Sequence, residues 1–320
     1  MGSGFVSRPT IGVDVGGTKI AAGLVDQSGK VLATERTESP AKHPDEIVAT
    51  IGQLVTRLSD GYDVEAVGVS AAGFVDKARA TVLFAPNLAW RDESLKKLLE
   101  KETGLPVVVE NDANAAAWGE FTFGAGEDID DLLMLTIGTG VGGGVVLDGE
   151  LMRGGFGVAA EVGHIAMVPD GEPCGCGNHG CLESYSSGRA LVRRAQEEAR
   201  KDPAAAAAVL AEAGGDPEKI TGPLVTTAAQ AGDAFAVARF TELGDWLGRG
   251  MATLSAVLDP TVVVVGGGVG EAGDLLLDPA RASYAAHVTA RDHRPMLEVR
   301  QAQLGNAGGM IGVADLARRR

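Results

Sequence analysis

Aromatic side chains and long apolar runs are scarce in this sequence of 320 residues. Phe, Trp and Tyr make up 4% of the chain, and no run approaches the roughly 18 consecutive apolar residues that suggest a membrane span. The first ten residues lack the apolar centre of a signal peptide. These features predict a globular protein of the cytoplasm that has no membrane partner.

Basic residues are also in short supply, since 28 Lys and Arg face 43 Asp and Glu and give a formal net charge of −15. A surface this acidic repels phosphate backbones, so a nucleic-acid partner is not expected. The only dense basic run, Arg318–Arg320, ends the chain, where cations typically complement a helix dipole. Glycine is abundant, with 46 residues, as in folds whose backbone approaches phosphate closely.

The length predicts two domains, because a single hydrophobic core stops growing at about 250–300 residues. Expected strands at 11–15 and 20–25 flank a glycine turn, and expected strands at 132–137 and 141–147 flank a second one. This repeat predicts a duplicated α/β fold with one copy in each domain. The main expected helices span residues 45–58, 113–121, 187–201, 234–258 and 308–319.

The first glycine turn belongs to the loop Asp14-Val15-Gly16-Gly17-Thr18-Lys19. Its glycines let backbone N–H groups turn toward an anion, and Thr18 adds a hydroxyl donor. Asp14 is placed to hold Mg²⁺ directly or through water. A plain hairpin turn of type I′ or II′ is the alternative interpretation, and the spacing of a Walker A loop is absent.

Two further glycine clusters offer similar chemistry. Gly138-Thr139-Gly140 repeats the first loop, and together the two loops predict a grip on a polyphosphate from both sides. Gly266–Gly270 follows an apolar strand and would admit a flat base or ribose close to the backbone. A dinucleotide-binding motif fits this third cluster only in part.

The segment Glu110-Asn111-Asp112 lies where an expected strand ends and an expected helix begins. Asp112 can cap this helix. It can also accept the proton of a hydroxyl group that attacks phosphorus, because phosphoryl transfer needs mainly positioning and charge neutralisation. The surrounding motifs favour Asp112 as a general base.

The three cysteines, Cys174, Cys176 and Cys181, lie within eight residues. An odd, tightly spaced set in a cytoplasmic chain favours a metal over disulfides. With His164 upstream they predict a closed zinc site of the Cys₃His type. His179 is the rival fourth ligand, although its place inside the loop would make a very tight chelate. Three reduced thiols in a surface loop are the remaining alternative.

Two carboxylates flank this cluster, since Glu161 precedes His164 by three residues and Glu183 follows Cys181 by two. A zinc ion bound to the four ligands would hold both carboxylates close together, where they could accept sugar hydroxyl groups. The second ring nitrogen of His164 also needs a partner and could face the substrate. The alternative is that Glu161 and Glu183 support the metal ligands or lie at the surface.

Together these motifs resemble the ROK family of sugar kinases and repressors, and most closely its ATP-dependent glucokinases from actinobacteria. The resemblance extends from Ile11 to about Arg318 and rests on the segments IGVDVGGTKIAAGLVD, VGVSAAGFVD, LFAPNLAW, VVVENDANAAAWGE, TIGTGVGGG, GVAAEVGHIAMVPDGEPCGCGNHGCLE and VVVVGGGV. It implies an actin/hexokinase-like, ribonuclease H type fold with two α/β domains around a cleft. The smaller domain would comprise residues 1–118 and 302–320, and the larger one residues 119–301 with the zinc loop.

The resemblance also implies an enzyme that transfers phosphate from ATP to the 6-hydroxyl group of glucose, with Mg²⁺ and Zn²⁺ as cofactors. Asp112 corresponds to the base, and His164, Cys174, Cys176 and Cys181 to the zinc ligands. The implied sugar contacts are Asn87, Asn111, Asp112, Glu161, His164 and Glu183. The implied nucleotide contacts are Asp14, Gly16, Gly17, Thr18, Lys19, Thr139, Gly140, Gly267 and Gly268. Family members are commonly homodimers or homotetramers.

Two alternatives remain beside a glucose kinase. One is a kinase for another hexose or an N-acetylhexosamine, or one that uses polyphosphate as the donor. The other is a repressor of the same family that senses sugar without phosphorylating it. Such repressors carry an N-terminal helix-turn-helix, and the ten residues before the first expected strand favour the kinase interpretation.

Overall fold

The computed structural model describes residues 8–320, which form two compact units. Unit 1 comprises Met1–Leu132, Gly144–Ala160 and Gln303–Arg320, and unit 2 comprises Leu133–Gly143 and Glu161–Ala302. Residues 1–7, which belong to the expected smaller domain and to the ten residues expected not to form a signal peptide, lie outside the described residues. The expected domain boundaries at 118/119 and 301/302 stay a prediction.

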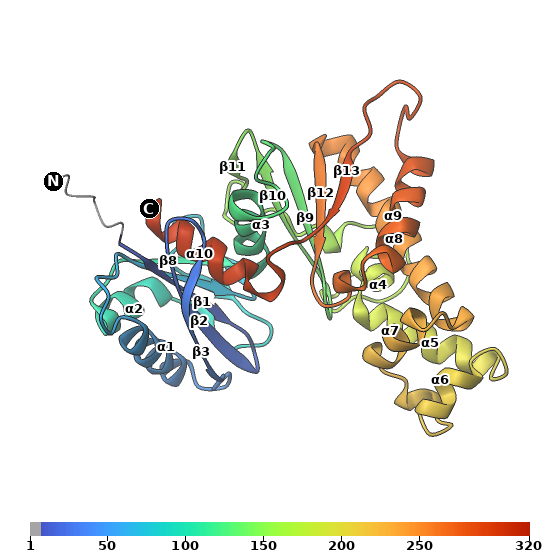
Figure 1. The fold of residues 1–320 in the computed structure, drawn as a ribbon, viewed down its shortest axis with the longest axis horizontal. Coiled ribbons are helices and arrows are strands. Elements are labelled where there is room, and N and C mark those ends of the chain that lie inside the picture. The colour runs from blue at the N-terminus through green and yellow to red at the C-terminus, as the bar shows by residue number, and fades with distance from the viewer. Residues whose placement is uncertain (1–7) are drawn as a thin grey trace. The chain divides into compact units, whose positions relative to one another are not determined.

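Unit 1 is built on a five-stranded sheet with the order β3-β2-β1-β4-β8 (Figure 1). The strands are β1 (Thr10–Val15), β2 (Lys19–Val25), β3 (Val31–Glu38), β4 (Val67–Ala71) and β8 (Val107–Asn111). The first three strands form an antiparallel meander, and β4 and β8 continue the sheet in parallel with β1. Three short strands, β5 (Phe74–Val75), β6 (Val82–Phe84) and β7 (Arg91–Glu93), form a separate small sheet.

Alternation along β1 gives this sheet two different faces. Ile11, Val13 and Val15 point into a core that includes α1 (Pro44–Leu58) and α2 (Leu95–Thr103). Gly12, on the other face, has no side chain, because a Cβ there would lie 1.9 Å from the Met310 carbonyl oxygen. Helix α10 (Gly308–Arg318) therefore packs its backbone directly on β1 and β4, beside α3 (Asp112–Phe123). Asp14 lies on this second face of β1, two residues after Gly12.

The second sheet has the order β11-β10-β9-β12-β13, which matches the first strand for strand. Its strands are β9 (Leu132–Ile137), β10 (Val141–Leu147), β11 (Glu150–Leu151), β12 (Val262–Gly266) and β13 (Glu298–Gln301). The boundary between the two units passes through β10, at Gly143–Gly144. This second copy and the mixed sheets confirm the predicted duplicated α/β fold.

The helices of unit 2 fill the connections between its strands. They are α4 (Glu183–Ser186), α5 (Gly188–Lys201), α6 (Ala207–Glu212), α7 (Gly222–Gln230), α8 (Ala234–Leu258) and α9 (Asp274–His287), with the short 3₁₀ turns η1 (Val162–His164), η2 (Pro217–Lys219) and η3 (Gly270–Ala272). A further 3₁₀ turn, η4 (Gly305–Ala307), precedes α10 in unit 1. Helix α8 packs along α9, where a Cβ on Gly248 would lie 2.4 Å from the Ala280 carbonyl oxygen.

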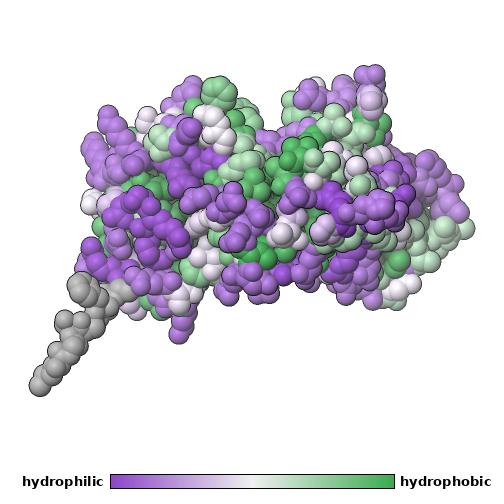
Figure 2. Space-filling view, turned by 90° about the horizontal axis from the view of Figure 1, so that it is seen from above, coloured by the Kyte–Doolittle hydropathy of each residue, from purple (hydrophilic) through white to green (hydrophobic). Residues whose placement is uncertain are grey.

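Among residues 8–320, no helix combines the length and apolar character required to cross a membrane. The face of the molecule in Figure 2 is covered mainly by hydrophilic residues, with hydrophobic residues in smaller patches between them. This distribution agrees with the acidic composition of the chain, which carries 43 Asp and Glu.

Candidate active site

The start of α3 holds Asp112 at the end of strand β8. Asn111 is the N-cap, because its Oδ1 atom accepts the Asn114 N–H at 3.0 Å. Asp112 is the first helical residue, and its Oδ1 accepts the Ala113 N–H at 3.0 Å and an Asn111 Nδ2–H at 3.1 Å. The cap of this helix is therefore Asn111, so the capping role considered for Asp112 is taken by its neighbour.

The charge environment of Asp112 suits a proton acceptor. Burial raises the pKa of Asp112, the nearby negative charge of Asp14 raises it further, and hydrogen bonds such as that from the Ala113 N–H oppose the rise. Burial likewise raises the pKa of Asp14, while a hydrogen bond of 2.7 Å from the Ser70 hydroxyl lowers it. A carboxylate with a raised pKa is a stronger base, which is typical of catalytic carboxylates.

The first glycine loop lies next to this carboxylate pair in unit 1. The Gly16 N–H donates to the Lys19 carbonyl oxygen at 3.0 Å. Neither Gly16 nor Gly17 has a positive φ, so the turn is not of type I′ or II′. A Cβ on Gly17 would lie 3.1 Å from both the Cβ and the carbonyl oxygen of Asn87. Asn87, an expected sugar contact, is therefore packed against the loop expected to bind nucleotide.

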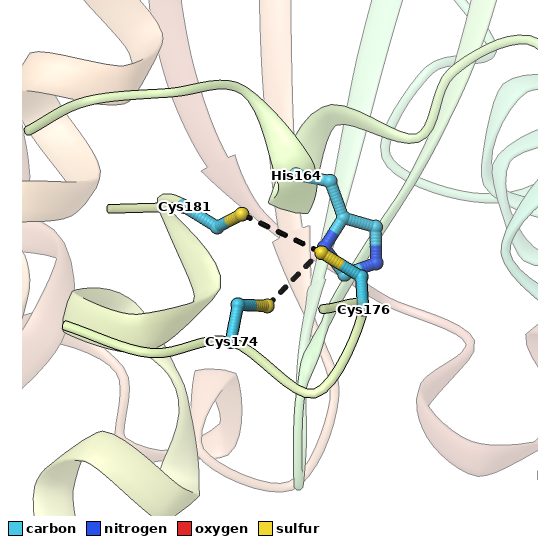
Figure 3. Close-up of side chains that lie close together, drawn as sticks. All are labelled: His164, Cys174, Cys176 and Cys181. Atoms are coloured by element: carbon cyan, nitrogen blue, oxygen red, sulfur yellow. Dashed lines mark hydrogen bonds between the residues drawn. The ribbon is translucent and has the colours of Figure 1, made fainter. Parts of the chain in front are cut away.

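In unit 2, the side chains of His164, Cys174, Cys176 and Cys181 converge on one point (Figure 3). Their ligand atoms all lie within 4.8 Å of one another. His164 points its Nδ1 atom at the sulfur atoms, 3.6 Å from Cys174 Sγ, and Cys176 Sγ lies 3.7 Å from Cys181 Sγ. The rival ligand His179 is not a member of this group. It is exposed, and its backbone pairs with Pro173 in an isolated antiparallel β-bridge.

These distances fit a zinc ion. Zinc bound at about 2.3 Å to sulfur and about 2.0 Å to nitrogen in a tetrahedron separates two sulfur ligands by about 3.8 Å and sulfur from nitrogen by about 3.5 Å. The distances from Cys176 Sγ to Cys181 Sγ, 3.7 Å, and from Cys174 Sγ to His164 Nδ1, 3.6 Å, agree with these values. Without an ion, burial raises the pKa of the Cys181 thiol to about 12. A divalent cation would offset this cost and hold the ligands as thiolates.

Glycines shape the loop that carries the ligands. Gly180 has a φ of 75°, and a Cβ there would lie 1.7 Å from the Val168 carbonyl oxygen, so only glycine fits between the last two ligands. The Cys174 N–H donates to the Asn178 carbonyl oxygen at 2.8 Å, which closes the turn that carries Cys176. His164 is the last residue of η1, and the exposed Glu161 directly precedes this 3₁₀ turn.

Glu183 connects the cysteine loop to the second glycine loop. Its Oε1 atom lies 3.7 Å from Cys174 Sγ, and its Oε2 atom accepts the Val141 N–H at 2.9 Å. Arg189, at the start of α5, pairs with Glu183 Oε1 at 3.0 Å and donates to the Thr139 carbonyl oxygen at 3.2 Å. Glu183 and Arg189 therefore clamp the turn at Thr139–Val141 from two sides. A Cβ on Gly140 would lie 2.2 Å from Glu183 Oε2, so this turn requires glycine.

A pocket of about 950 Å³ opens beside this turn and lies entirely within unit 2. Its walls are the turn at Gly138-Thr139, the first turns of α5 and α7, and the Gly268-Val269 segment after β12. Gly267 has a φ of 83° and packs against the Ile137 carbonyl oxygen, while a Cβ on Gly268 would meet no atom within 4 Å. The pocket has room for a nucleotide, with Arg189 and Arg193 in its lining.

The structure thus gathers the expected residues into two sets. Unit 1 holds Asp14, Gly16, Gly17, Thr18, Lys19, Asn87, Asn111 and Asp112, and unit 2 holds Thr139, Gly140, Glu161, His164, Cys174, Cys176, Cys181, Glu183, Gly267 and Gly268. Two residues of the site were not predicted from the sequence: Ser70, which donates to Asp14, and Arg189, which holds the second loop. A serine within the otherwise apolar run Val67–Ala71 was the available signal for Ser70.

The chain is similar to known proteins over nearly its whole length. The ROK family profile matches residues 10–320. The chain is 50% identical over 309 residues to the glucokinase of Streptomyces coelicolor, with 97% of each chain covered. It is 38% identical over 311 residues to the glucokinase of Halalkalibacterium halodurans, covering 94% of this chain and 92% of that protein.

Among solved structures, the ROK family glucokinase from Streptomyces griseus, in complex with glucose and AMPPNP, matches with a TM-score of 0.88 and 52% identity. The match covers 98% of this chain and 100% of that one. The fold is that of a sugar kinase, and this chain belongs to the ROK family. The family predicted from the sequence motifs is therefore confirmed.

Proposed function

We propose that this protein is a glucokinase that transfers the γ-phosphoryl group of ATP to the 6-hydroxyl group of glucose. One observation supports this most strongly: the chain matches glucokinases over nearly its whole length, and one of them was crystallised with glucose and an ATP analogue. The two sets of side chains described above supply groups suited to each substrate.

Asp112 acts in this proposal as the general base. Its carboxylate takes the proton of the 6-hydroxyl group as that oxygen attacks the γ-phosphorus, and its raised pKa strengthens it as an acceptor. Asn111, already held by the Asn114 N–H, keeps its amide beside Asp112 and orients the carboxylate. Asn87 lies against Gly17, where it can contact the sugar or the phosphates.

Sugar recognition is assigned to Glu161, His164 and Glu183 in unit 2. His164 directs Nδ1 to the cysteines, which leaves Nε2 as the nitrogen that would face a sugar hydroxyl group. His164 and the three cysteines would hold zinc, which supplies structural anchoring of this loop. Glu183 keeps hydrogen bonds to Val141 and Arg189, and a carboxylate has lone pairs for a hydroxyl donor as well.

The pocket beside Thr139 is assigned to ATP. The turn at Thr139-Gly140 and the loop at Gly16–Lys19 would bind phosphate groups through backbone N–H groups, and Gly267-Gly268 leaves room for the base or ribose. Asp14 would hold Mg²⁺, which neutralises phosphate charge. Its half-buried carboxylate, with a pKa raised by partial burial, fits such a cation. A homodimer or homotetramer in the cytoplasm is also proposed, and light scattering of the purified protein tests the assembly.

The test is a coupled kinase assay with a panel of sugars and with ATP or polyphosphate as the donor. We expect glucose and ATP to give the highest kcat/KM, and Asp112→Asn to abolish turnover while glucose binding by calorimetry persists. Asp26→Asn, which changes a carboxylate in the turn after β2, is the matched control and should keep normal turnover. Preference for another sugar would reassign the substrate, and no product with any sugar would favour a sensor.

A further inference from the structure

A charged cluster around the buried Glu110 lies at the end of β8, two residues before Asp112. Glu110 is the next-to-last residue of β8, directly before Asn111, and it is 0% exposed. Its Oε2 atom lies 2.8 Å from Arg153 Nε and 3.0 Å from Arg79 Nε. Because a buried carboxylate is costly unless cations and donors surround it, Glu110 depends on these two arginines.

The other oxygen of Glu110 reaches the residues that begin α3. Oε1 accepts the Asn111 N–H at 2.9 Å and an Nδ2–H of Asn114 at 3.3 Å. Asn111 in turn caps the helix and donates to Asp112 Oδ1. A single carboxylate therefore links both arginines to the turn that carries the proposed base.

Arg153 extends this network to the segment 152–160. Its guanidinium donates to the carbonyl oxygen atoms of Lys77 at 2.9 Å and Asp76 at 3.0 Å. Gly157, with a φ of 95°, packs on the same turn, since a Cβ there would lie 2.5 Å from the Lys77 nitrogen. Arg153 is 9% exposed. Through its contacts with Glu110 and with the Asp76-Lys77 turn, it joins the segment that precedes Glu161 to the end of β8.

We propose that Arg153 and Glu110 are positioning residues for phosphoryl transfer, which orient Asp112 through the turn at Asn111. The inference rests on the proposed function, in which Asp112 is the base. Neither residue needs to touch a substrate. A network that acts by orientation lowers kcat when it is broken, because small displacements of a catalytic group are costly in rate.

The first experiment compares Arg153→Met with Arg318→Met. Arg318 is a matched control, because its side chain is also mostly buried (13% exposed), pairs with the buried Asp315 at 2.9 Å and binds a backbone carbonyl at Val25. We expect both variants to lower the unfolding temperature. Arg153→Met should lower kcat by about 10- to 100-fold, with a smaller change in the KM for ATP, and Arg153→Lys should restore part of it. Equal kcat values for Arg153→Met and Arg318→Met would show that the cluster only stabilises the fold.

A second measurement does not depend on activity. Hydrogen exchange of the segment 110–117 should accelerate in Arg153→Met and stay near the wild-type rate in Arg318→Met. Without Arg153, the Glu110 carboxylate that accepts the Asn111 N–H is no longer held in place, and the Asn111 side chain that accepts the Asn114 N–H follows it. Glu110→Gln combined with Arg153→Met should be no worse than Arg153→Met alone, and additive losses would overturn the coupling. A wild-type protein without kinase activity would refute the proposed function, whereas unchanged exchange would refute the positioning role.

Discussion

The clamp on the turn at Thr139–Val141 leads to a quantitative prediction for Gly140→Ala. The new methyl carbon would lie 2.2 Å from Glu183 Oε2 and 3.0 Å from its Cδ, distances that real Cβ atoms do not tolerate. The backbone of a closely held turn cannot yield far, so the carboxylate has to move. Its movement breaks the 2.9 Å hydrogen bond from the Val141 N–H.

The size of the effect follows from the bond that is lost. A hydrogen bond to a charged group contributes about 1.5–3 kcal/mol, because the buried N–H is otherwise left without its acceptor. The ion pair of Glu183 with Arg189 adds little, since the arginine side chain is 61% exposed. At about 1.4 kcal/mol for each tenfold change, nucleotide affinity should fall by roughly 10- to 100-fold if the turn must be ordered to bind phosphate.

The assay is calorimetric titration with an ATP analogue in the absence of sugar, so that any contact of Glu183 with the sugar does not enter. The control is a double-mutant cycle of Gly140→Ala, Glu183→Ala and the combined variant. If the methyl group acts by displacing the carboxylate, it should have little effect once Glu183 is alanine. Additive losses would show that the methyl group blocks the phosphates itself, and unchanged affinity in Gly140→Ala would refute the clamp.

Three further predictions concern stability and metal content. Burial and the charge of Asp14 raise the pKa of Asp112, so the wild type loses stability as the pH rises from about 3.9, the pKa of an unfolded Asp, through the raised value. Asp112→Asn should therefore unfold at a higher temperature than the wild type at pH 7. Calorimetry checks this, and the same pH dependence of the unfolding temperature in both proteins would contradict it. Cys176→Ser should lose zinc, measured by atomic absorption, and unfold at a lower temperature; retained metal would exclude Cys176 as a ligand. Ala160 has a φ of 69°, which costs energy for any residue with a Cβ, so Ala160→Gly should cause no loss of stability. Ala159→Gly should destabilise the protein by about 0.5–1 kcal/mol. Denaturant titrations measure both variants, and similar losses would show that the backbone at Ala160 is unstrained.

Much of the framework was accessible from local sequence. Strands β9 and β10 and helix α8 have the predicted bounds, because an apolar run beside a glycine turn and a long periodic segment are strong signals. Helix α9 was missed, since it contains Pro279 and follows a glycine-rich segment, both of which argue against a helix. Strand β3 was missed because its sequence, VLATERTE, does not alternate apolar and polar residues; the alternating burial is visible only in the structure.

The site shows where local sequence stops being informative. Asn111 and Asp112 are both good caps, and only the three-dimensional turn decides that Asn111 takes the role. Glu183 reaches the Val141 N–H across 42 positions, and Arg153 reaches Lys77 across 76. Contacts of this range depend on how loops fold back, which no residue pattern within a window records.

The packing of α10 against β1 and β4 has a consequence for synthesis of the chain. Strands β1 and β4 leave the ribosome well before the segment that covers one of their faces, Gln303–Arg320. Until then, the face of the sheet at Gly12 and Gly68, on which the backbone of α10 packs, stays uncovered by this helix. A premature stop codon just before Gln303 would therefore leave this face of the unit 1 sheet without its helix, and we expect chaperones or proteases to bind such a product.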